Sequence, residues 1–313
     1  MSNAIVVDHL RKSYASKSGA PVQALDGVCF EVPEGHIFGL LGPNGAGKST
    51  TVKILGTVST PTSGSASVFG FDVAKQPLQA RRKMAVVLQQ TAAENMLTVQ
   101  DNLLIYAYLH GMSRRDAQVR VKQVSEEFEL GDKMTSTVQE LSLGTKRRIQ
   151  IAKTFMLDTP LIILDEATTG MDPMMKRRMM DRLRTEARSG RTILLTTQVL
   201  SEAEELCETI MIVDKGRTMA SGTLQELRKR SSQMFRVALS FGDSDADLSR
   251  LLQSLNPAKL DVSGRNAEMV IHAEESSLLS KLADVSRTVP ILQFEVRGPT
   301  LEEIFMQLVK EAA

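Results

Sequence analysis

The sequence predicts an α/β protein in which a large domain with a parallel sheet is followed by a small α+β domain. Three apolar runs of strand length alternate with helical patterns, at residues 37–41, 161–164 and 192–197. Such runs are typical of parallel strands that are buried on both faces. A mostly helical insertion is predicted at about residues 91–157. Because the pattern changes beyond residue 222, we expect a large domain at 1–222 and an accessory domain at 223–313.

Composition and charge narrow the class of protein. The 313 residues suffice for two unequal domains. A hydrophobic content of 42% is ordinary for a globular protein, and a net charge of +1 gives no reason to expect nucleic acid as a partner. No apolar run approaches the ~20 residues that span a bilayer, and the N-terminus lacks the apolar core of a signal peptide. Any membrane association is therefore expected to come through a partner.

Cysteine, histidine and the basic clusters give no sign of a separate site. Cys29 and Cys207 are isolated, as expected of reduced thiols in a cytosolic protein. The histidines, which lack metal-ligand spacing, are expected to be structural or exposed: His9, His36, His110 and His272. Four short basic clusters are expected on solvated faces, at residues 81–83, 146–148, 176–178 and 228–230.

The first 90 residues are predicted to be rich in strands. Strands are expected at 4–7 and 28–32, with Tyr14 in the polar loop between them. After the first helix, a turn at 61–64 is expected to lead into a short strand at 67–71.

The helical insertion follows a strand at 85–88 and carries two N-terminal signatures. Thr98 with Asp101, and Ser113 with Asp116, are predicted to cap two successive helices.

The sheet is predicted to resume after the insertion. Met175 and Met179 lie on one stripe of a helix between two buried strands, and we interpret them as core filling rather than as a cofactor site. Ser201 with Glu204 is predicted to cap the next helix. The strand at 210–213 is expected to close the sheet.

The accessory domain is predicted to have the order βαββαβ with one added helix, which suggests a ferredoxin-like fold. Strands are expected at 235–241, 269–271 and 292–296, and Thr300 with Glu303 is predicted to cap the final helix. The domain shows no catalytic constellation, so we interpret it as regulatory or as a dimer contact.

The segment after the first buried run has the pattern of a phosphate-binding loop, G-x-x-x-x-G-K-[ST]. It reads Gly42, Pro43, Asn44, Gly45, Ala46, Gly47, Lys48, Ser49 and Thr50. The glycines let the backbone wrap phosphates, and the following helix start aims N–H groups at them. Lys48 is expected to meet the β- and γ-phosphate oxygens, and Ser49 to offer its hydroxyl to Mg²⁺.

Two acids follow the second buried run. Asp165 and Glu166 lie at the carboxyl end of a parallel strand, which is where ligands bind in open α/β sheets. Asp165 is expected to hold the Mg²⁺ shell, and Glu166 to polarise the attacking water.

These motifs and three further segments resemble an ATP-binding cassette (ABC) ATPase over residues 4–222. The further segments are Gln89, residues 141–145 and residues 169–172, which follow in the order and spacing of that family. The segment 141–145 narrows the resemblance from nucleotide hydrolases in general to this family.

The resemblance implies ATP and Mg²⁺ as ligands and gives roles to other residues. Tyr14 would stack on adenine, and Gln89 would sense both Mg²⁺ and a permease. Ser142 and Gly144, at a helix start, would reach the γ-phosphate held by a second protomer. Asp172 would lie at the dimer interface, although an aspartate before a proline also suits a helix N-cap, so we expect both roles.

Three residues depart from the family pattern. Leu143 replaces a glycine and Thr145 a glutamine, while Ser142 and Gly144 are kept. Gln198 stands where the family has a histidine, and a glutamine can donate a hydrogen bond to the γ-phosphate but cannot titrate. Weak hydrolysis, or pairing with a different subunit, is therefore an open alternative.

The C-terminal block at residues 298–305 resembles the separate ATPase subunits of drug- and polysaccharide-exporting (ABC-2-type) systems. That resemblance implies a homo- or heterodimer that drives an integral membrane permease, placed at the cytoplasmic face of the cell membrane through that partner. An ABC ATPase acting on ribosomes or DNA is the alternative. Ribosome-acting members usually carry two cassettes in one chain, and DNA-acting members contain long coiled coils. The sequence shows one cassette and no long coiled coil, which argues against this alternative.

Overall fold

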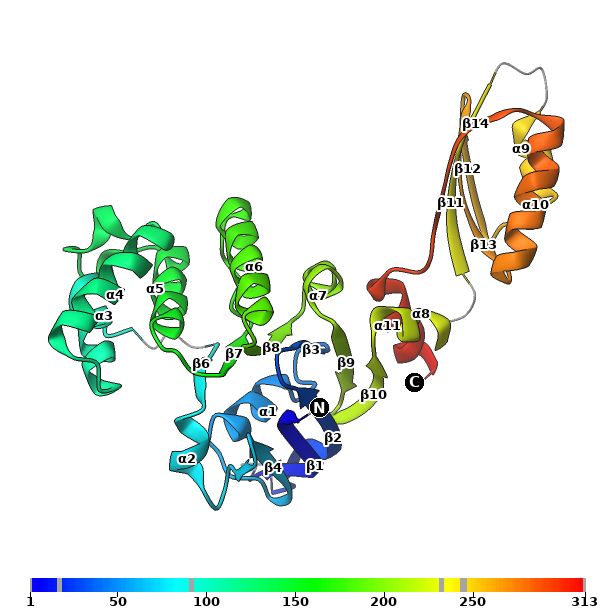
Figure 1. Cartoon of the computed structure of the whole chain (residues 1–313). Helices are drawn as coiled ribbons and strands as arrows, with labels where there is room; N and C mark the ends of the chain where they lie inside the picture. The colour runs from blue at the N-terminus through cyan, green and yellow to red at the C-terminus, as the bar shows by residue number, and fades with distance from the viewer. Residues whose placement is uncertain (1, 16–18, 90–92, 231–233, 243–246, 312–313) are drawn as a thin grey trace. The chain divides into compact units, whose positions relative to one another are not determined.

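A computed structural model describes residues 2–15, 19–89, 93–230, 234–242 and 247–311 (Figure 1). The chain forms two compact units, Met1–Ser221 and Gly222–Ala313. No helix in the described ranges is both long enough and apolar enough to cross a membrane.

A six-stranded sheet with the order β10-β9-β3-β8-β7-β6 is the centre of the first unit. Its strands are β3 (Ile37–Leu41), β6 (Met84–Val87), β7 (Leu161–Asp165), β8 (Thr192–Thr197), β9 (Thr209–Asp214) and β10 (Arg217–Gly222). The three predicted apolar runs are β3, β7 and β8, which are adjacent, parallel and fully buried. The expectation that residues 210–213 close the sheet is wrong, because β10 lies beyond β9 at that edge.

Two hydrophobic cores lie on opposite faces of this sheet. Along β7, Leu161 and Ile163 belong to one core and Ile162 and Leu164 to the other. This alternation follows from the period of two along a strand. As a result, the carboxyl ends of the central strands are held rigidly from both sides.

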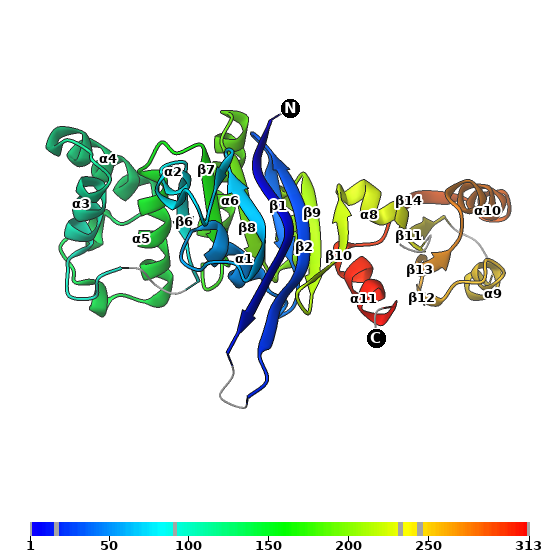
Figure 2. The ribbon, with the colours of Figure 1, turned by 90° about the horizontal axis from the view of Figure 1, so that it is seen from below.

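A four-stranded antiparallel sheet packs on one of these cores. It has the order β2-β1-β4-β5 and consists of β1 (Asn3–Tyr14), β2 (Val22–Pro33), β4 (Ser63–Val68) and β5 (Phe71–Asp72). Strands β1 and β2 run side by side (Figure 2). The rings of Phe30 and Phe38 stack at 5.3 Å between centroids and join this sheet to β3.

Three expectations for this region need correction. Tyr14 is not in a loop but ends β1, where it pairs with Val22, because backbone pairing extends both strands past their apolar parts. The strand expected at 67–71 is two strands, since the backbone turns at Phe69 and Gly70, which have φ values of 48° and 79°. The expected turn at 61–64 is shorter, because β4 already begins at Ser63.

The helices of the first unit are α1 (Lys48–Leu55), α2 (Pro77–Arg81), α3 (Val99–Leu109), α4 (Arg114–Glu127), α5 (Leu143–Phe155), α6 (Pro173–Arg188) and α7 (Leu200–Leu206), with short 3₁₀ turns at Gly131–Lys133 and Val138–Glu140. The predicted caps Thr98 and Ser113 are confirmed, since their side chains accept N–H bonds in the first turns of α3 and α4. The stripe of Met175 and Met179 is buried core, as predicted. The cap expected at Ser201 is wrong, because α7 begins one residue earlier without a side-chain cap.

The second unit has the predicted ferredoxin-like strand order, β12-β13-β11-β14. Its elements are α8 (Leu224–Arg230), β11 (Met234–Phe241), α9 (Leu248–Gln253), β12 (Lys259–Ser263), β13 (Asn266–His272), α10 (Glu275–Thr288), β14 (Ile291–Arg297) and α11 (Leu301–Glu311). The side chains of α9 and α10 share one core with the inward face of the sheet. Thr300 and Glu303 form the predicted reciprocal cap of α11.

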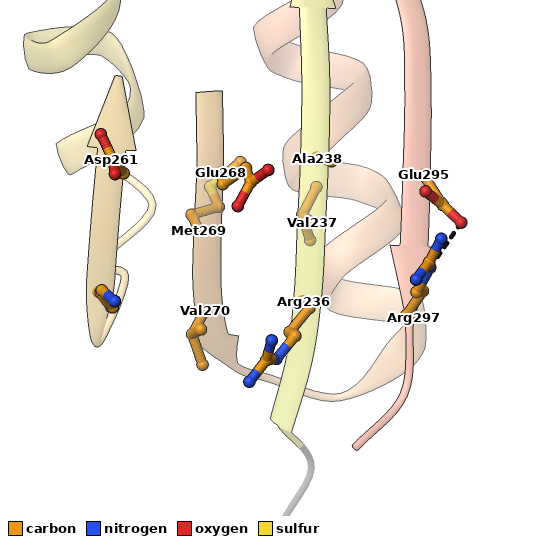
Figure 3. Close-up of a pocket in the computed structure, with 10 residues that line it drawn as sticks. Arg236, Val237, Ala238, Asp261, Glu268, Met269, Val270, Glu295 and Arg297 are labelled. Atoms are coloured by element: carbon orange, nitrogen blue, oxygen red, sulfur yellow. Dashed lines mark hydrogen bonds and ion pairs between the residues drawn. The ribbon is translucent and has the colours of Figure 1, made fainter. Parts of the chain in front are cut away.

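The outward face of that sheet carries its charges in rows (Figure 3). By strand register, one row holds the cations Lys259, Arg236 and Arg297, and the next row holds the carboxylates Asp261, Glu268 and Glu295. Strand β14 lies at the sheet edge, where Leu292 is 73% exposed and Phe294 is 62% exposed.

Candidate nucleotide-binding site

The phosphate loop joins β3 to α1 and lines a hollow of about 280 Å³. Residues of the β2 segment also line it, from Val22 to Ala24. Gly47 has a φ of 109°, and a Cβ there would lie 2.6 Å from Leu25 Cδ2 and 2.7 Å from the Ala24 carbonyl oxygen. Only glycine suits this position, because both the dihedral angle and the contact exclude a side chain.

Lys48, the first residue of α1, is 4% exposed. Its ammonium donates to the carbonyl oxygens of Gly42 at 2.8 Å and Pro43 at 3.1 Å, and lies 3.7 Å from Glu166 Oε1. Burial lowers the pKa of Lys48, while the charges of Glu166 and Asp165 act to raise it. The loop therefore presents a positive charge at the bottom of the hollow, and a phosphate would be a stronger partner for it than neutral carbonyls.

Asp165 ends β7 and is 1% exposed. Its Oδ1 accepts hydrogen bonds from the hydroxyls of Thr196 at 2.6 Å and Ser49 at 3.2 Å. Its other oxygen, Oδ2, is buried without a hydrogen-bond partner among the described residues. A buried carboxylate oxygen without a donor, beside a serine hydroxyl, is an oxygen donor set that fits Mg²⁺.

Glu166 follows Asp165 in a left-handed conformation, with a φ of 49°. Its N–H donates to the backbone and side-chain oxygens of Thr196, each at 3.1 Å. The carboxylate accepts from Gln89 Nε2 at 2.9 Å on Oε2 and from Gln198 Nε2 at 2.7 Å on Oε1. Three residues far apart in sequence thus converge on the Glu166 carboxylate: Gln89 and Gln198, which follow β6 and β8, and Lys48 of the phosphate loop.

Gln198, which follows β8, bridges two parts of the site. Its Nε2 donates to Glu166 Oε1 and, at 2.8 Å, to Asn44 Oδ1 of the phosphate loop. Both amide hydrogens therefore have acceptors within the protein.

Arg147 was not predicted as part of the site, and the expectation that its basic cluster is solvated is wrong for this residue. It lies on α5 and is 5% exposed. The guanidinium donates to backbone carbonyls of two separate segments, namely Leu88 and Gln89 on one side and Asp165, Glu166 and Ala167 on the other, at 2.6–3.2 Å. The helical spacing could have revealed the burial of Arg147, because the residue lies four positions before the buried Ile151, on the same face of the helix.

The other predicted residues lie outside this hollow. Tyr14 is opposite Val22 and is 39% exposed, with the Lys12 ammonium 5.1 Å from its ring centre. Ser142 is the N-cap of α5, and a Cβ on Gly144 would lie 3.1 Å from the carbonyl oxygen of Gly170.

Asp172 is the predicted N-cap of α6. Its Oδ1 accepts from the Met175 N–H at 2.9 Å, and a proline occupies the first helical position.

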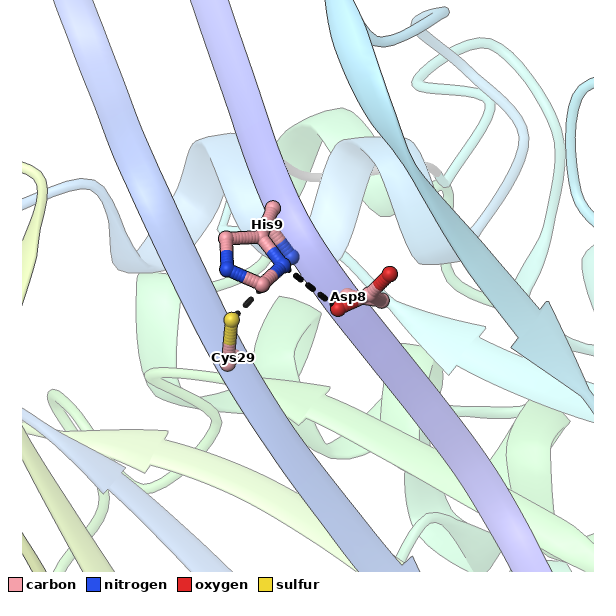
Figure 4. A group of neighbouring side chains, drawn as sticks. All are labelled: Asp8, His9 and Cys29. Atoms are coloured by element: carbon pink, nitrogen blue, oxygen red, sulfur yellow. Dashed lines mark hydrogen bonds and ion pairs between the residues drawn. The ribbon is translucent and has the colours of Figure 1, made fainter.

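One grouping of metal-ligating side chains occurs among the described residues, on the neighbouring strands β1 and β2 of the antiparallel sheet (Figure 4). The ring atom Nδ1 of His9 forms a hydrogen bond with Asp8 Oδ1 at 2.6 Å, and the backbone N–H of His9 donates to Cys29 Sγ at 3.1 Å. Spacing along the chain did not reveal it, because Cys29 comes from the neighbouring strand. All three residues are exposed, and none of them belongs to the nucleotide site.

Both units match known protein families. Residues 25–169 match the family described as ABC transporter. Residues 222–309 match the family described as ATP-binding protein DrrA1-3-like, C-terminal domain.

Curated relatives are similar over nearly the whole chain. The daunorubicin/doxorubicin resistance ATP-binding protein DrrA of Streptomyces peucetius is 35% identical over 93% of this chain and 89% of its own length. The Nod factor export ATP-binding protein I of Rhizobium meliloti is 35% identical over 98% of this chain and 88% of its own length.

Solved structures share the fold of the first unit. An ATP-binding subunit of an ABC transporter superposes with a TM-score of 0.67 at 31% identity, covering 72% of this chain and 92% of its own. The ATP-binding cassette MJ0796, a dimer in a post-hydrolysis state with ADP and Pi, gives a TM-score of 0.65 at 24% identity, covering 70% of this chain and 98% of its own.

Proposed function

This chain belongs to the ATP-binding proteins of the ABC transporter family, and on that basis we propose that it hydrolyses ATP to drive export through a separate membrane permease. The observation that carries the proposal is that similarity to two export or resistance ATP-binding proteins extends over both units. The convergence of the buried Lys48, Asp165 and Glu166 at the phosphate loop supports it.

The residues of the site divide the work of binding. The loop N–H groups and Lys48 hold the β- and γ-phosphates, and Tyr14 stacks on adenine beside the β2 segment. Ser49, Gln89 and Asp165 would hold Mg²⁺, for which the partnerless Asp165 Oδ2 is the supporting observation. When bound, Mg²⁺ would neutralise charge that develops on the phosphate oxygens.

Glu166 acts on the water that attacks the γ-phosphorus. As the bond from the water oxygen to phosphorus forms and the bond to the β-γ bridging oxygen breaks, the proton of the water passes to the Glu166 carboxylate. Gln89 and Gln198 hold that carboxylate in place from both sides, and Lys48 offsets charge on the phosphate oxygens.

Two copies complete each other's sites in this proposal. Ser142 and Gly144 at the start of α5 present N–H groups to the γ-phosphate bound by the partner copy, and Asp172 lies at the same interface. The close approach of Gly144 to Gly170 supports it, because it brings the 141–145 segment and the 169–172 segment together on one surface.

The permease is proposed to dock on the helical insertion. Tyr108, Leu109 and Ile105 lie on one face of α3 and are 43%, 79% and 43% exposed, and Met96 in the preceding segment is 80% exposed. Apolar side chains gathered on one exposed helix face are typical of a protein-binding surface. Docking there would hold the chain at the cytoplasmic face of the membrane.

The proposal is tested by ATP binding and turnover of the wild type and Lys48→Ala. Calorimetry should show Mg²⁺-dependent binding of ATP to the wild type, and Lys48→Ala should abolish binding or turnover because its ammonium is the cation of the loop. Unchanged affinity and turnover in the variant would contradict the assignment. A wild type that binds ATP without turnover would instead favour a nucleotide-gated subunit in a heterodimer, an alternative supported by the engagement of Gln198 with Asn44.

A further inference from the structure

We propose that Arg147 is a positioning residue that couples the two nucleotide sites of the dimer. It would transmit the engagement of Ser142 and Gly144 with the partner's nucleotide to Glu166 and Gln89 of its own site. The inference rests on the proposed function, since it takes from it the dimer in which α5 faces the partner's ATP.

Arg147 holds the backbone of two separate segments. A guanidinium has five N–H groups in a rigid plane, and those of Arg147 are directed at five carbonyls and at Gln150 Oε1. The carbonyls belong to Leu88–Gln89 and to Asp165–Ala167, the two segments that supply the metal-sensing glutamine and the general base. One buried side chain thus fixes the backbone of both segments to α5.

Glu166 has a left-handed backbone conformation that Arg147 helps to hold. A non-glycine residue with positive φ persists only where its surroundings hold it on several sides. The N–H of Glu166 is held by Thr196, and its carbonyl oxygen accepts from Arg147 Nη2 at 2.6 Å and from the Thr169 N–H at 3.3 Å. Loss of the guanidinium would leave one weak bond on the carbonyl side, so the carboxylate would lose its fixed place.

Helix α5 connects Arg147 to the residues that would contact the partner's nucleotide. Gly144 and Arg147 lie on the same helix, three positions and about 4.5 Å of helical rise apart. A displacement of the α5 start by a bound γ-phosphate therefore moves the guanidinium with it. Since the guanidinium holds both segments, occupancy of one site is felt at the general base of the other.

The experiment compares the wild type with Arg147→Gln, Arg147→Lys and the matched control Arg148→Gln. Arg148 is the next residue on α5, carries the same charge, and bonds only to Phe128, Glu129 and Thr145 among the described contacts. Lysine keeps the charge at position 147 but cannot span five carbonyls. Three quantities are measured: ATP affinity, the ATP dependence of turnover, and amide hydrogen exchange without nucleotide.

We expect Arg147→Gln to bind ATP within about 2-fold of the wild type, because the phosphate loop is untouched. Its kcat should fall about 10-fold or more, as when a charge-assisted hydrogen bond is lost, and its Hill coefficient should fall from above 1 to 1. Arg147→Lys should recover little of either. Amide exchange should accelerate at residues 88–89 and 165–167 but not at 37–55, and Arg148→Gln should match the wild type.

Several results would overturn the inference. These are a hyperbolic wild-type curve, a wild-type Hill coefficient in Arg147→Gln, equal loss of kcat in the Arg148 control, or exchange at 165–167 that does not change. A wild type without turnover would contradict the proposed function instead, and the exchange measurement would still decide whether Arg147 holds the two segments.

Discussion

Replacement of Gln198 by histidine is the perturbation most specific to this chain. In the structure both amide hydrogens of Gln198 are directed at protein oxygens, on Glu166 and Asn44. To donate to a γ-phosphate, the amide must give up one of these bonds. The bond to neutral Asn44 is the weaker one, and breaking it costs about 1 kcal/mol.

A second contribution comes from the strength of the new bond. A hydrogen bond from an ionised donor is about twice as strong as one from a neutral donor, a difference of about 1 kcal/mol. Together the two effects amount to about 2 kcal/mol, or roughly 30-fold in rate. This is less than the 10²–10³-fold that follows complete loss of a preorganised donor. We therefore expect slow hydrolysis in the wild type and a 10- to 30-fold higher kcat in Gln198→His, by the same conversion.

The assay is steady-state turnover at saturating MgATP from about pH 6 to 8. Because an imidazolium is the stronger donor and the ordinary pKa of histidine is about 6.5, the ratio of variant to wild type should be larger at the acid end. Gln198→Ala sets the rate without any donor, and Glu166→Gln measures contaminating activity. Equal rates with identical pH profiles for Gln198 and histidine would refute the reasoning, because Gln198 would then fully replace the imidazole.

Two further outcomes are expected. Glu166→Gln should bind ATP, stop hydrolysis and trap an ATP-dependent dimer, since the amide keeps the shape but cannot take a proton; light scattering that shows only monomers with ATP at high protein concentration would argue against a homodimer. Among the thiols, exposed Cys29 should react with N-ethylmaleimide at about pH 8, whereas burial raises the pKa of the Cys207 thiol and should protect it until denaturant is added. Mass spectrometry that finds both thiols modified equally fast in the folded chain would contradict this packing.

The sequence was sufficient for those parts of the fold and site that depend on short segments. The central strands are uninterrupted apolar runs, and the helix caps at Thr98, Ser113 and Thr300 each depend on side chains within one turn. The phosphate loop is equally local, because its glycines and Lys48 act within nine residues. The roles assigned to individual site residues stay predictions until they are measured.

Features that depend on distant pairing could not be predicted. Tyr14 joins β1 only because Val22 pairs with it, and residues 217–222 form a strand only because β9 lies beside them. Arg147 looked like one cation of a solvated cluster, because its partners come from segments 18 and 59 residues away. Burial of a charge is decided by carbonyls whose direction is fixed only when the strands are assembled.

The exposed edge of the C-terminal sheet affects how readily the protein can aggregate. Strand β14 pairs with β11 alone among the described strands, so its other side offers unpaired N–H and C=O groups beside Leu292 and Phe294. Such an edge can add a strand from another chain, which is the first step of aggregation. Glu295 and Arg297, on the same strand, act as charged gatekeepers against this. A fragment containing only the second unit would present the same edge, with those two charges beside it as the protection against strand addition.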